Sequence, residues 1–447
     1  MTRTAKSTSF ILFALFFATT LSFVDRSLLN ILVRPIRAEV GIDDLQFSLL
    51  QGASFAIAYS VAAFPAAYLS DRYGPRRIMI AAVAFWSVMT LAFGLAESFS
   101  MLIITRIGLA VGEAGLSPSS IAMVRQTLRP DRQSFGVSIL ALGAYVGGGL
   151  SMLAGGPALA MLEANPSALP FGFTPWRALF AACAIIGIIA LPLMMALPEA
   201  DVSTKKTGAT MRHFFIAMNE RRGAALCYLS AYVGAMGLSW ATKAWMPAIF
   251  VRSFGWDEVR TGVAYGTVYL IGGVIGALSA GRLTGLLTRR GVSCATVVVV
   301  RGAVALMSLA VLAAVAAPNG EIALAFLTLS LLAAGAILAL GAFGFQEMFS
   351  PEFSARAVAI YLIAPGALGG AIGPSAVPLL QGLMGPGAST GAALGLFSAI
   401  VCVWALLWFG LFLKFQRPFA SSLMPVAEGA GMTPVQGKTI AAKANDD

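Results

Sequence analysis

Two opposite charges lie inside one apolar run of the sequence, between residues 103 and 115. Arg106 and Glu113 are seven residues apart in this run. Seven residues make two turns of a helix, so both side chains project from one face. Burying either charge in hydrocarbon costs at least about 2.5–3.5 kcal/mol, so such residues face a bundle interior or a water-filled cavity and commonly serve function. We predict that this helix lines a polar cavity within a membrane.

Two further charges lie at a similar depth in other apolar runs. Asp25 interrupts the run that starts near Phe10, and Lys243 lies in the run 223–250. With a rise of about 1.5 Å per residue across a core of about 30 Å, Asp25 and Arg106 both lie about 22 Å from the predicted cytoplasmic edge. Lys243 comes out near 20 Å and Glu113 near 12 Å by the same rise. We therefore predict that charges from three helices meet in one aqueous chamber.

These charges are candidates for proton and anion binding. We expect Asp25 to pair with Arg106 while no substrate is bound, and an anionic substrate group to compete for Arg106 and Lys243. Asp25, once it has lost its partner in a low-dielectric site, would take a proton. Glu113 would be a second protonatable site nearer the cytoplasm. The alternatives are a structural ion pair for Asp25 and Arg106, and a helix-packing hydrogen bond for Glu113.

Lys243, Trp240 and Arg26 are weaker candidates for substrate binding. Lys243 itself could extend outward to the membrane interface, because its side chain is long. Trp240 precedes it by three residues and shares its face, which is compatible with an aromatic wall or with core packing. Arg26 points about 100° away from Asp25 and could bond the neighbouring backbone instead of a substrate.

The composition is that of an integral membrane protein. The chain has 447 residues, of which 58% are hydrophobic and 11% charged, with a mean hydropathy of +0.83; soluble domains carry about 25% charged residues. Twelve apolar stretches are long enough to span a bilayer. We predict an all-α membrane protein of two six-helix halves, residues 1–197 and 223–417. A cytoplasmic linker (198–222) would join them, and a disordered cytoplasmic tail (418–447) would follow.

The net charge of +10 does not indicate nucleic-acid binding once the charges are located. Most Lys and Arg residues fall in loops on one side of the predicted spans. This positive-inside bias places both termini in the cytoplasm, and we expect the inner (plasma) membrane of a bacterium. The four cysteines lie in apolar spans without metal-binding spacing, and His213 is the sole histidine. No zinc-protease motif, Walker loop or nucleophile with a base is present, so we expect no enzyme, no metal and no cofactor.

A short basic segment, Asp71-Arg72-Tyr73-Gly74-Pro75-Arg76-Arg77, follows the second span. We expect Asp71 to lie on a loop, cap a helix N-terminus and pair with Arg72 or Arg132. Together with Arg76, these residues are the candidate cytoplasmic gate. A degenerate copy follows the eighth span, with Gly281 in place of the aspartate, as a two-fold transporter architecture predicts.

The segment 71–77 resembles the helix 2–3 signature of the major facilitator superfamily, although Ala67 stands where that signature has its leading glycine. Phe23-Val24-Asp25-Arg26, the run 106–114 and the run 245–255 are similar to the spinster-like transporters. That resemblance implies proton-linked export of lysolipids or sphingoid phosphates, with Asp25, Arg106 and Glu113 at coupling positions. It also implies that helices 1, 4, 7 and 10 line the cavity and that helices 3, 6, 9 and 12 face lipid. Arg301, on helix 9, would then extend to the interface or be structural.

The function we predict is proton-coupled secondary transport of an amphipathic or organic anion by alternating access. Uptake of small organic or sugar acids on the same fold is the alternative. A non-transporting receptor is less favoured, because neither the tail nor the central loop is large enough for an output domain. The expected partners are a small-molecule or lipid anion, protons and the lipid bilayer. We expect no nucleic acid and a monomer.

Overall fold

The computed structural model describes residues 8–165, 169, 172–199, 211–349, 357, 360, 361 and 364–420. Within these residues, twelve helical segments are long and apolar enough to cross a membrane. The expected all-α membrane fold is therefore confirmed.

The first half consists of six spans and one short helix on the surface. Its helices are α1 (Thr8–Leu28), α2 (Val33–Val40), α3 (Asp44–Ser48), η1 (Leu49–Ala53), α4 (Ser54–Tyr73), α5 (Pro75–Gly94), α6 (Phe99–Glu113), α7 (Leu116–Thr127), α8 (Pro130–Ala164) and α9 (Pro175–Met195). The second span combines α3, η1 and α4, and the fourth combines α6 and α7.

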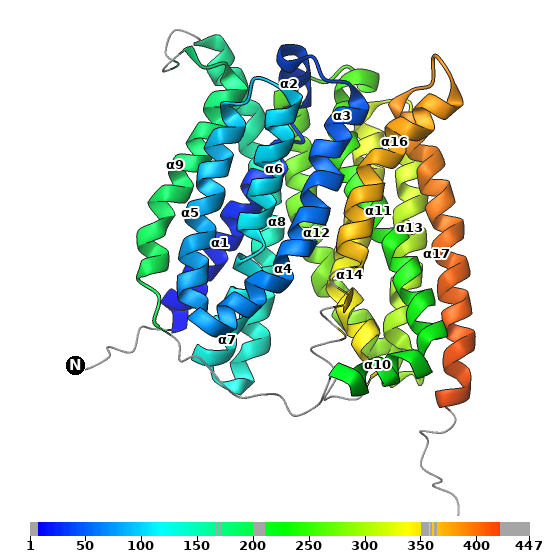
Figure 1. Ribbon diagram of the computed structural model, residues 1–447. Coiled ribbons are helices and arrows are strands. Elements are labelled where there is room, and N and C mark those ends of the chain that lie inside the picture. Colours follow the sequence, from blue (N-terminus) through cyan, green and yellow to red (C-terminus); the bar gives the residue numbers. More distant parts are fainter. Residues whose placement is uncertain are drawn as a thin grey trace, which may run out of the picture.

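The second half repeats the arrangement. Its helices are α10 (Met211–Glu220), α11 (Arg222–Phe254), α12 (Glu258–Arg289), α13 (Ala295–Val315), α14 (Gly320–Gln346), η5 (Pro365–Gly369), α16 (Gly370–Met384) and α17 (Thr390–Ala420). Figure 1 shows the two groups of helices side by side, with the start of α1 and the end of α17 at the same edge. We call this edge the termini side and the opposite edge the far side.

The two halves meet along α8 with α12, and along η1 and α4 with α16. Glycines of α8, which have no side chain, allow the close approach. A Cβ on Gly156 would lie 3.2 Å from the Cα of Val259, and a Cβ on Gly149 would lie 2.8 Å from the Cβ of Leu270. Small residues at a helix interface let two backbones come together in a membrane, where lipid supplies no hydrophobic drive.

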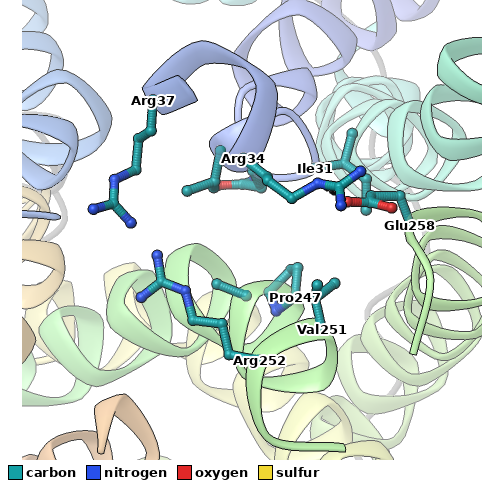
Figure 2. Close-up of a pocket in the computed structure, with 10 residues that line it drawn as sticks. Ile31, Arg34, Arg37, Pro247, Val251, Arg252 and Glu258 are labelled. Carbon is teal, nitrogen blue, oxygen red and sulfur yellow. Dashed lines mark ion pairs between the residues drawn. The ribbon is translucent and has the colours of Figure 1, made fainter. Parts of the chain in front are cut away.

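Ion pairs join the halves on the far side. Arg252 of α11 donates two hydrogen bonds of 2.9 Å to Asp44 of α3, and Arg37 of α2 lies 2.6 Å from the same carboxylate. Arg34 pairs with Glu258 of α12 at 2.6 Å. Figure 2 shows Arg37 and Arg252 reaching toward each other across a pocket of about 150 Å³ between the halves. Among the described residues, the ion pairs between the halves are all on this side.

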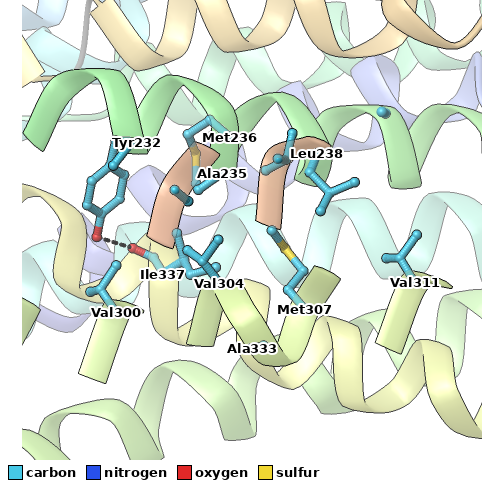
Figure 3. Close-up of a cluster of buried hydrophobic side chains, with 14 of the residues drawn as sticks. Tyr232, Ala235, Met236, Leu238, Val300, Val304, Met307, Val311, Ala333 and Ile337 are labelled. Atoms are coloured by element: carbon cyan, nitrogen blue, oxygen red, sulfur yellow. Dashed lines mark hydrogen bonds between the residues drawn. The ribbon is translucent and has the colours of Figure 1, made fainter. Parts of the chain in front are cut away.

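The core of the second half is packed mainly with aromatic and aliphatic side chains. Tyr228 and Tyr232 of α11 stack with ring centroids 4.9 Å apart. Their hydroxyls donate to carbonyl oxygens of α14, from Tyr228 to Gly341 at 2.7 Å and from Tyr232 to Ile337 at 3.3 Å. Figure 3 shows Tyr232 and its neighbours packed between the helices. These two buried hydroxyls thus have the partners that an apolar environment favours.

Several expected boundaries differ from the structure. The segment 71–77 is not a loop: α4 continues to Tyr73, and Gly74, with a φ of 90°, is the single residue before α5. The linker 198–222 contains the helix α10, and residues 200–210 of it lie outside the described residues. The expected disordered tail also lies outside them from residue 421, while residues 418–420 belong to α17. Residues 350–356, which precede the eleventh span, lie outside them too.

Candidate functional site

The predicted charges are all inside the protein. The exposed fraction of Asp25 is 2%, that of Arg106 and Glu113 is 1%, and that of Arg26 and Lys243 is 8%. Asp25 and Arg26 lie in the last turn of α1, and Glu113 is the last residue of α6, where Ala114 and Gly115 interrupt the fourth span. The prediction that these residues avoid lipid is confirmed.

Arg26 of α1 forms an ion pair with Glu113 of α6. The same carboxylate oxygen of Glu113 accepts a hydrogen bond of 2.6 Å from the hydroxyl of Ser22. Ser22 and Arg26 are four residues apart and therefore lie on one face of α1. The sequence indicated Arg26 as a candidate for substrate binding, with neighbouring backbone as the alternative partner, and it did not predict this ion pair.

Asp25 faces a different neighbour. One of its carboxylate oxygens accepts a hydrogen bond from the hydroxyl of Thr90 on α5. Its other oxygen is buried and has no hydrogen-bond partner among the described residues. A step of one residue turns the side chain by about 100° around a helix, which is why Asp25 and Arg26 reach different helices.

Arg106 points from α6 toward the second span. Its Nε donates to the carbonyl oxygen of Leu50 in η1 at 3.2 Å, and its guanidinium carbon lies 4.9 Å from the centre of the Phe55 ring. One terminal nitrogen is buried without a partner in the described part of the chain. The expected ion pair between Asp25 and Arg106 is therefore wrong for this structure, because α1 turns Asp25 toward α5 while Arg106 reaches η1.

Two phenylalanine rings connect the cations. The Phe55 ring lies 4.2 Å from the guanidinium carbon of Arg26 and 4.9 Å from that of Arg106. The Phe23 ring lies 4.5 Å from Arg26 and 6.0 Å from the ammonium of Lys243 on α11. Aromatic faces attract cations at these distances. The two halves thus bring Arg26 and Lys243 to one ring, whereas the depth estimate had predicted that Asp25, Arg106 and Lys243 share one chamber.

Lys243 is enclosed by aromatic rings. Its ammonium lies 5.2 Å from the Tyr269 ring centre and 5.8 Å from that of Trp240. No carboxylate lies within ion-pair distance of it among the residues that the structure describes. The alternative in which Lys243 extends to the membrane interface is wrong, and Trp240 forms the aromatic wall that its spacing allowed.

A cavity of about 160 Å³ lies between the halves beside these side chains. Its wall is largely apolar and aromatic, and Arg26 and Lys243 are its two charges. The residues that line it are Phe23, Arg26, Tyr145, Met236, Ser239, Trp240, Thr242, Lys243, Tyr269, Met307, Ser330, Leu331, Ala334 and Leu338.

The lining helices differ in part from the expected set. The cavity is lined from α1, α8, α11, α12, α13 and α14, so the fifth, eighth and ninth spans contribute besides the first, seventh and tenth. Met307 of α13 is fully buried and lines the cavity, so the ninth span does not face lipid alone. Glu113 and Arg106 of the fourth span do not line the cavity, but Glu113 pairs with Arg26, which does.

The candidate gate residues do not contact one another as expected. Asp71 lies in the last turn of α4 and forms no ion pair with Arg72 or Arg132 within the described residues. Arg72 instead donates to the Tyr68 hydroxyl at 3.4 Å. Arg76 donates to the carbonyl of Met195 and lies 3.5 Å from Glu199, so it attaches the start of α5 to the end of α9.

Of the aromatic side chains in the site, the sequence indicated only Trp240. Tyr145 of α8 and Tyr269 of α12 face each other across the two halves with ring centroids 5.9 Å apart, and Phe55 separates two guanidinium groups. The spacing of Phe55 and Tyr59, four residues apart and stacked, is a signal that would have pointed to this face. Tyr145 lies in a glycine-rich stretch whose sequence carries no comparable sign.

Two six-helix groups around a central cavity with buried charges define a membrane transport protein. A family model described as Major Facilitator Superfamily matches residues 15–374. The chain belongs to this superfamily.

Individual relatives agree with this assignment. The chain is 28% identical over 371 residues to an MFS-type efflux pump of Mycolicibacterium smegmatis, covering 81% of this chain and 82% of the relative. It is 23% identical over 294 residues to a probable L-galactonate transporter of Escherichia coli, covering 62% of each. The fold matches a bacterial homologue of the human lysosomal transporter Spinster, in an inward-facing and unoccupied conformation. That match has a TM-score of 0.77 and 21% identity, and covers 94% of this chain and 99% of that one. The likeness to spinster-like transporters is thus confirmed for the fold.

Proposed function

We propose that this protein is a proton-coupled secondary transporter of a small organic anion, working by alternating access. The observation that carries the proposal is Lys243, a buried cation that faces the cavity without a carboxylate partner among the described residues. A buried ammonium needs a counter-charge. A carboxylate from the cargo would supply it, while Trp240 and Tyr269 would contact the body of the cargo.

Arg26 would link the cargo to the proton. It lines the cavity and at the same time pairs with Glu113. An anion that draws Arg26 into the cavity leaves the Glu113 carboxylate buried with only the Ser22 hydroxyl as a partner. An unpaired buried carboxylate takes up a proton, because the charged form is costly in a low-dielectric site. In this scheme Glu113 is the first protonation site.

Asp25 and Arg106 would act in another step of the cycle. Each has one buried polar atom without a partner among the described residues, and both lie next to the cluster around Arg26. A rotation of α1 that turns Asp25 away from Thr90 would bring its carboxylate toward these cations. Asp25 is thus the second proton-coupling residue of the proposal, and Arg106 the group that receives it.

The cavity favours a small acid as cargo. Its volume of about 160 Å³ is below the range of about 300–1,000 Å³ that encloses drug-sized ligands. A relative named as a probable L-galactonate transporter also has a sugar acid in its name. Both observations support the alternative of small organic or sugar acids over a lysolipid or sphingoid phosphate.

The same proposal includes the location and the gates. The basic residues at the end of α4, the start of α5 and the end of α12 lie on the termini side. By the positive-inside rule, this is the cytoplasmic side of a bacterial inner membrane. The contact through Asp44, Arg252, Arg34 and Glu258 would open on the far side. The group Asp71, Arg72, Arg76 and Arg132 would close the termini side, and the monomer would be the working unit.

Flux into proteoliposomes tests the proposal. Purified protein would be assayed with a panel of radiolabelled small organic acids, sugar acids and a lysolipid, with and without an inward proton gradient. We expect one of the small acids to accumulate only with the gradient. Lys243→Gln should weaken binding of that acid about tenfold or more, whereas Lys243→Arg should keep most of it.

Arg290→Gln, which removes one exposed positive charge at the end of α12, is the matched control. Its binding should equal that of the unaltered protein. Equal accumulation with and without the proton gradient would contradict the proposed proton coupling. Accumulation of the lysolipid alone would replace the small acid as cargo, and undiminished binding to Lys243→Gln would remove this lysine from the site.

A further inference from the structure

A groove outside the central cavity lies between α13 and α17. Its volume is about 360 Å³. Leu407 and Leu411 of α17, whose exposed fractions are 60% and 39%, place it on the outer surface of the helix bundle. The residues that line it are Arg301, Leu406, Leu407, Gly410, Leu411, Leu413 and Lys414.

Two cations lie in this groove without an acidic residue beside them. Arg301 is six residues into α13, about 9 Å from its start at a rise of about 1.5 Å per residue. Neither Arg301 nor Lys414 has an ion pair with any described residue, and the lining contains no Asp or Glu. A guanidinium at such a depth in a membrane is costly unless an anion or water reaches it.

The rest of the groove is shaped for a chain of apolar groups. Leu407, Gly410 and Lys414 follow one another at three and four residues, so they form one stripe along α17. A Cβ at Gly410 would meet no atom within 4 Å, so the groove is open at this point. Leucines cover its sides, and both cations are near the termini-side ends of their helices.

We propose that this groove binds an anionic phospholipid. The phosphate group would lie between Arg301 and Lys414, and one acyl chain would pass over Gly410 between the leucines. Charge complementarity selects this occupant: the bilayer that surrounds α13 and α17 supplies phosphate and hydrocarbon in one molecule. A free anion would leave the leucines without a partner. A second copy of this chain would have to bring a carboxylate into the hydrocarbon.

Native mass spectrometry of the full-length protein with phosphatidylglycerol and phosphatidylcholine tests this site. The unaltered protein should retain phosphatidylglycerol preferentially. The double variant Arg301→Gln with Lys414→Gln should retain at least about fivefold less phosphatidylglycerol, since each cation near a membrane surface contributes to binding an anionic lipid. Arg290→Gln removes one positive charge outside the groove and should change nothing.

Gly410→Leu provides a second, independent test, because it fills the groove and keeps both cations. It should also lower phosphatidylglycerol retention severalfold, while leucine in place of glycine suits a helix. Equal retention by the double variant, or an equal loss in Arg290→Gln, would overturn the proposal. A dimer whose mass disappears with Gly410→Leu would assign the groove to a second copy instead. The transport cargo plays no part in this readout.

Discussion

The two halves of this transporter have opposite interiors. Of the five charged residues that are buried in the described part of the chain, Asp25, Arg26, Arg106 and Glu113 belong to the first half, and only Lys243 belongs to the second. The second half is filled mainly with aromatic and aliphatic groups, and the hydroxyls of Tyr228 and Tyr232 there donate to helix carbonyls. Two copies of one helix arrangement thus differ in the kind of side chain that they bury.

This difference indicates a division of labour. The first half holds its charges through contacts between α1, α5 and α6, in which Glu113 binds both Ser22 and Arg26 and Asp25 binds Thr90. The second half offers one cation and a wall of rings to the same cavity. In the proposed function, the first half handles the proton and the second half recognises the body of the cargo. The predictions below separate these tasks.

Arg26→Ala should have the largest effect, because Arg26 belongs to both tasks. We expect transport to fall by about 100-fold or more, measured as acid uptake into proteoliposomes. Removing one member of a buried ion pair also costs about 3–5 kcal/mol of stability, because the other charge is left alone. The double variant Arg26→Ala with Glu113→Gln should regain thermal stability without regaining uptake. A double variant that transports normally would take Arg26 out of the mechanism.

Glu113→Gln should separate the tasks. We expect accumulation driven by the proton gradient to fall about tenfold or more. Exchange of labelled for unlabelled cargo should stay within about threefold of the rate of the unaltered protein, because Arg26 and Lys243 still line the cavity. Asp25→Asn is the comparison. If only Asp25→Asn removes the response to the gradient, the proton site belongs to the pair that the sequence first indicated.

Asp44→Asn should have a smaller effect, on how the halves separate. Asp44 is the carboxylate that both Arg37 and Arg252 contact on the far side. Partly exposed ion pairs contribute about 0.2–1 kcal/mol each, so the far side should open about two- to fivefold more often. The measurement is the labelling rate of a cysteine at Val251 by a membrane-impermeant maleimide, in a protein without its native cysteines.

Glu163→Gln is the matched control for that measurement, since Glu163 is exposed at the far-side end of α8. Its labelling rate should not change. An unchanged rate in Asp44→Asn would show that these ion pairs do not hold the halves together.

The smallest expected effect is on stability at acid pH, through Glu39 of α2. Burial tends to raise the pKa of this carboxyl, but hydrogen bonds from Arg177, Thr174 and Trp176 outweigh it and lower the pKa below its ordinary value of 4.5. The stabilisation is therefore complete above that value and is lost as the pH falls through the lowered pKa. We expect Glu39→Gln to reduce the loss of thermal stability below about pH 4.5. An identical pH profile would contradict this.

The sequence predicted the spans and the burial of charge, because both follow from the cost of polar groups in hydrocarbon. It did not predict which charges pair. The depth of Asp25, Arg106 and Lys243 follows from counting residues, but the partner of each depends on how far its helix is rotated. The short π-helical segment η1 before α4 and the interruption at Ala114 and Gly115 change that rotation. Neither irregularity has a clear sequence signal.

The cations of the two halves face one cavity, and this has a consequence for leakage. Arg26 and Lys243 share the Phe23 ring from opposite halves, so bringing the halves together around an empty cavity would push like charges toward each other. Their repulsion grows as water leaves. An anion between them cancels it. A carrier built in this way would change between its two conformations slowly when empty and readily when an anion is bound. This difference would limit the transport of protons without cargo.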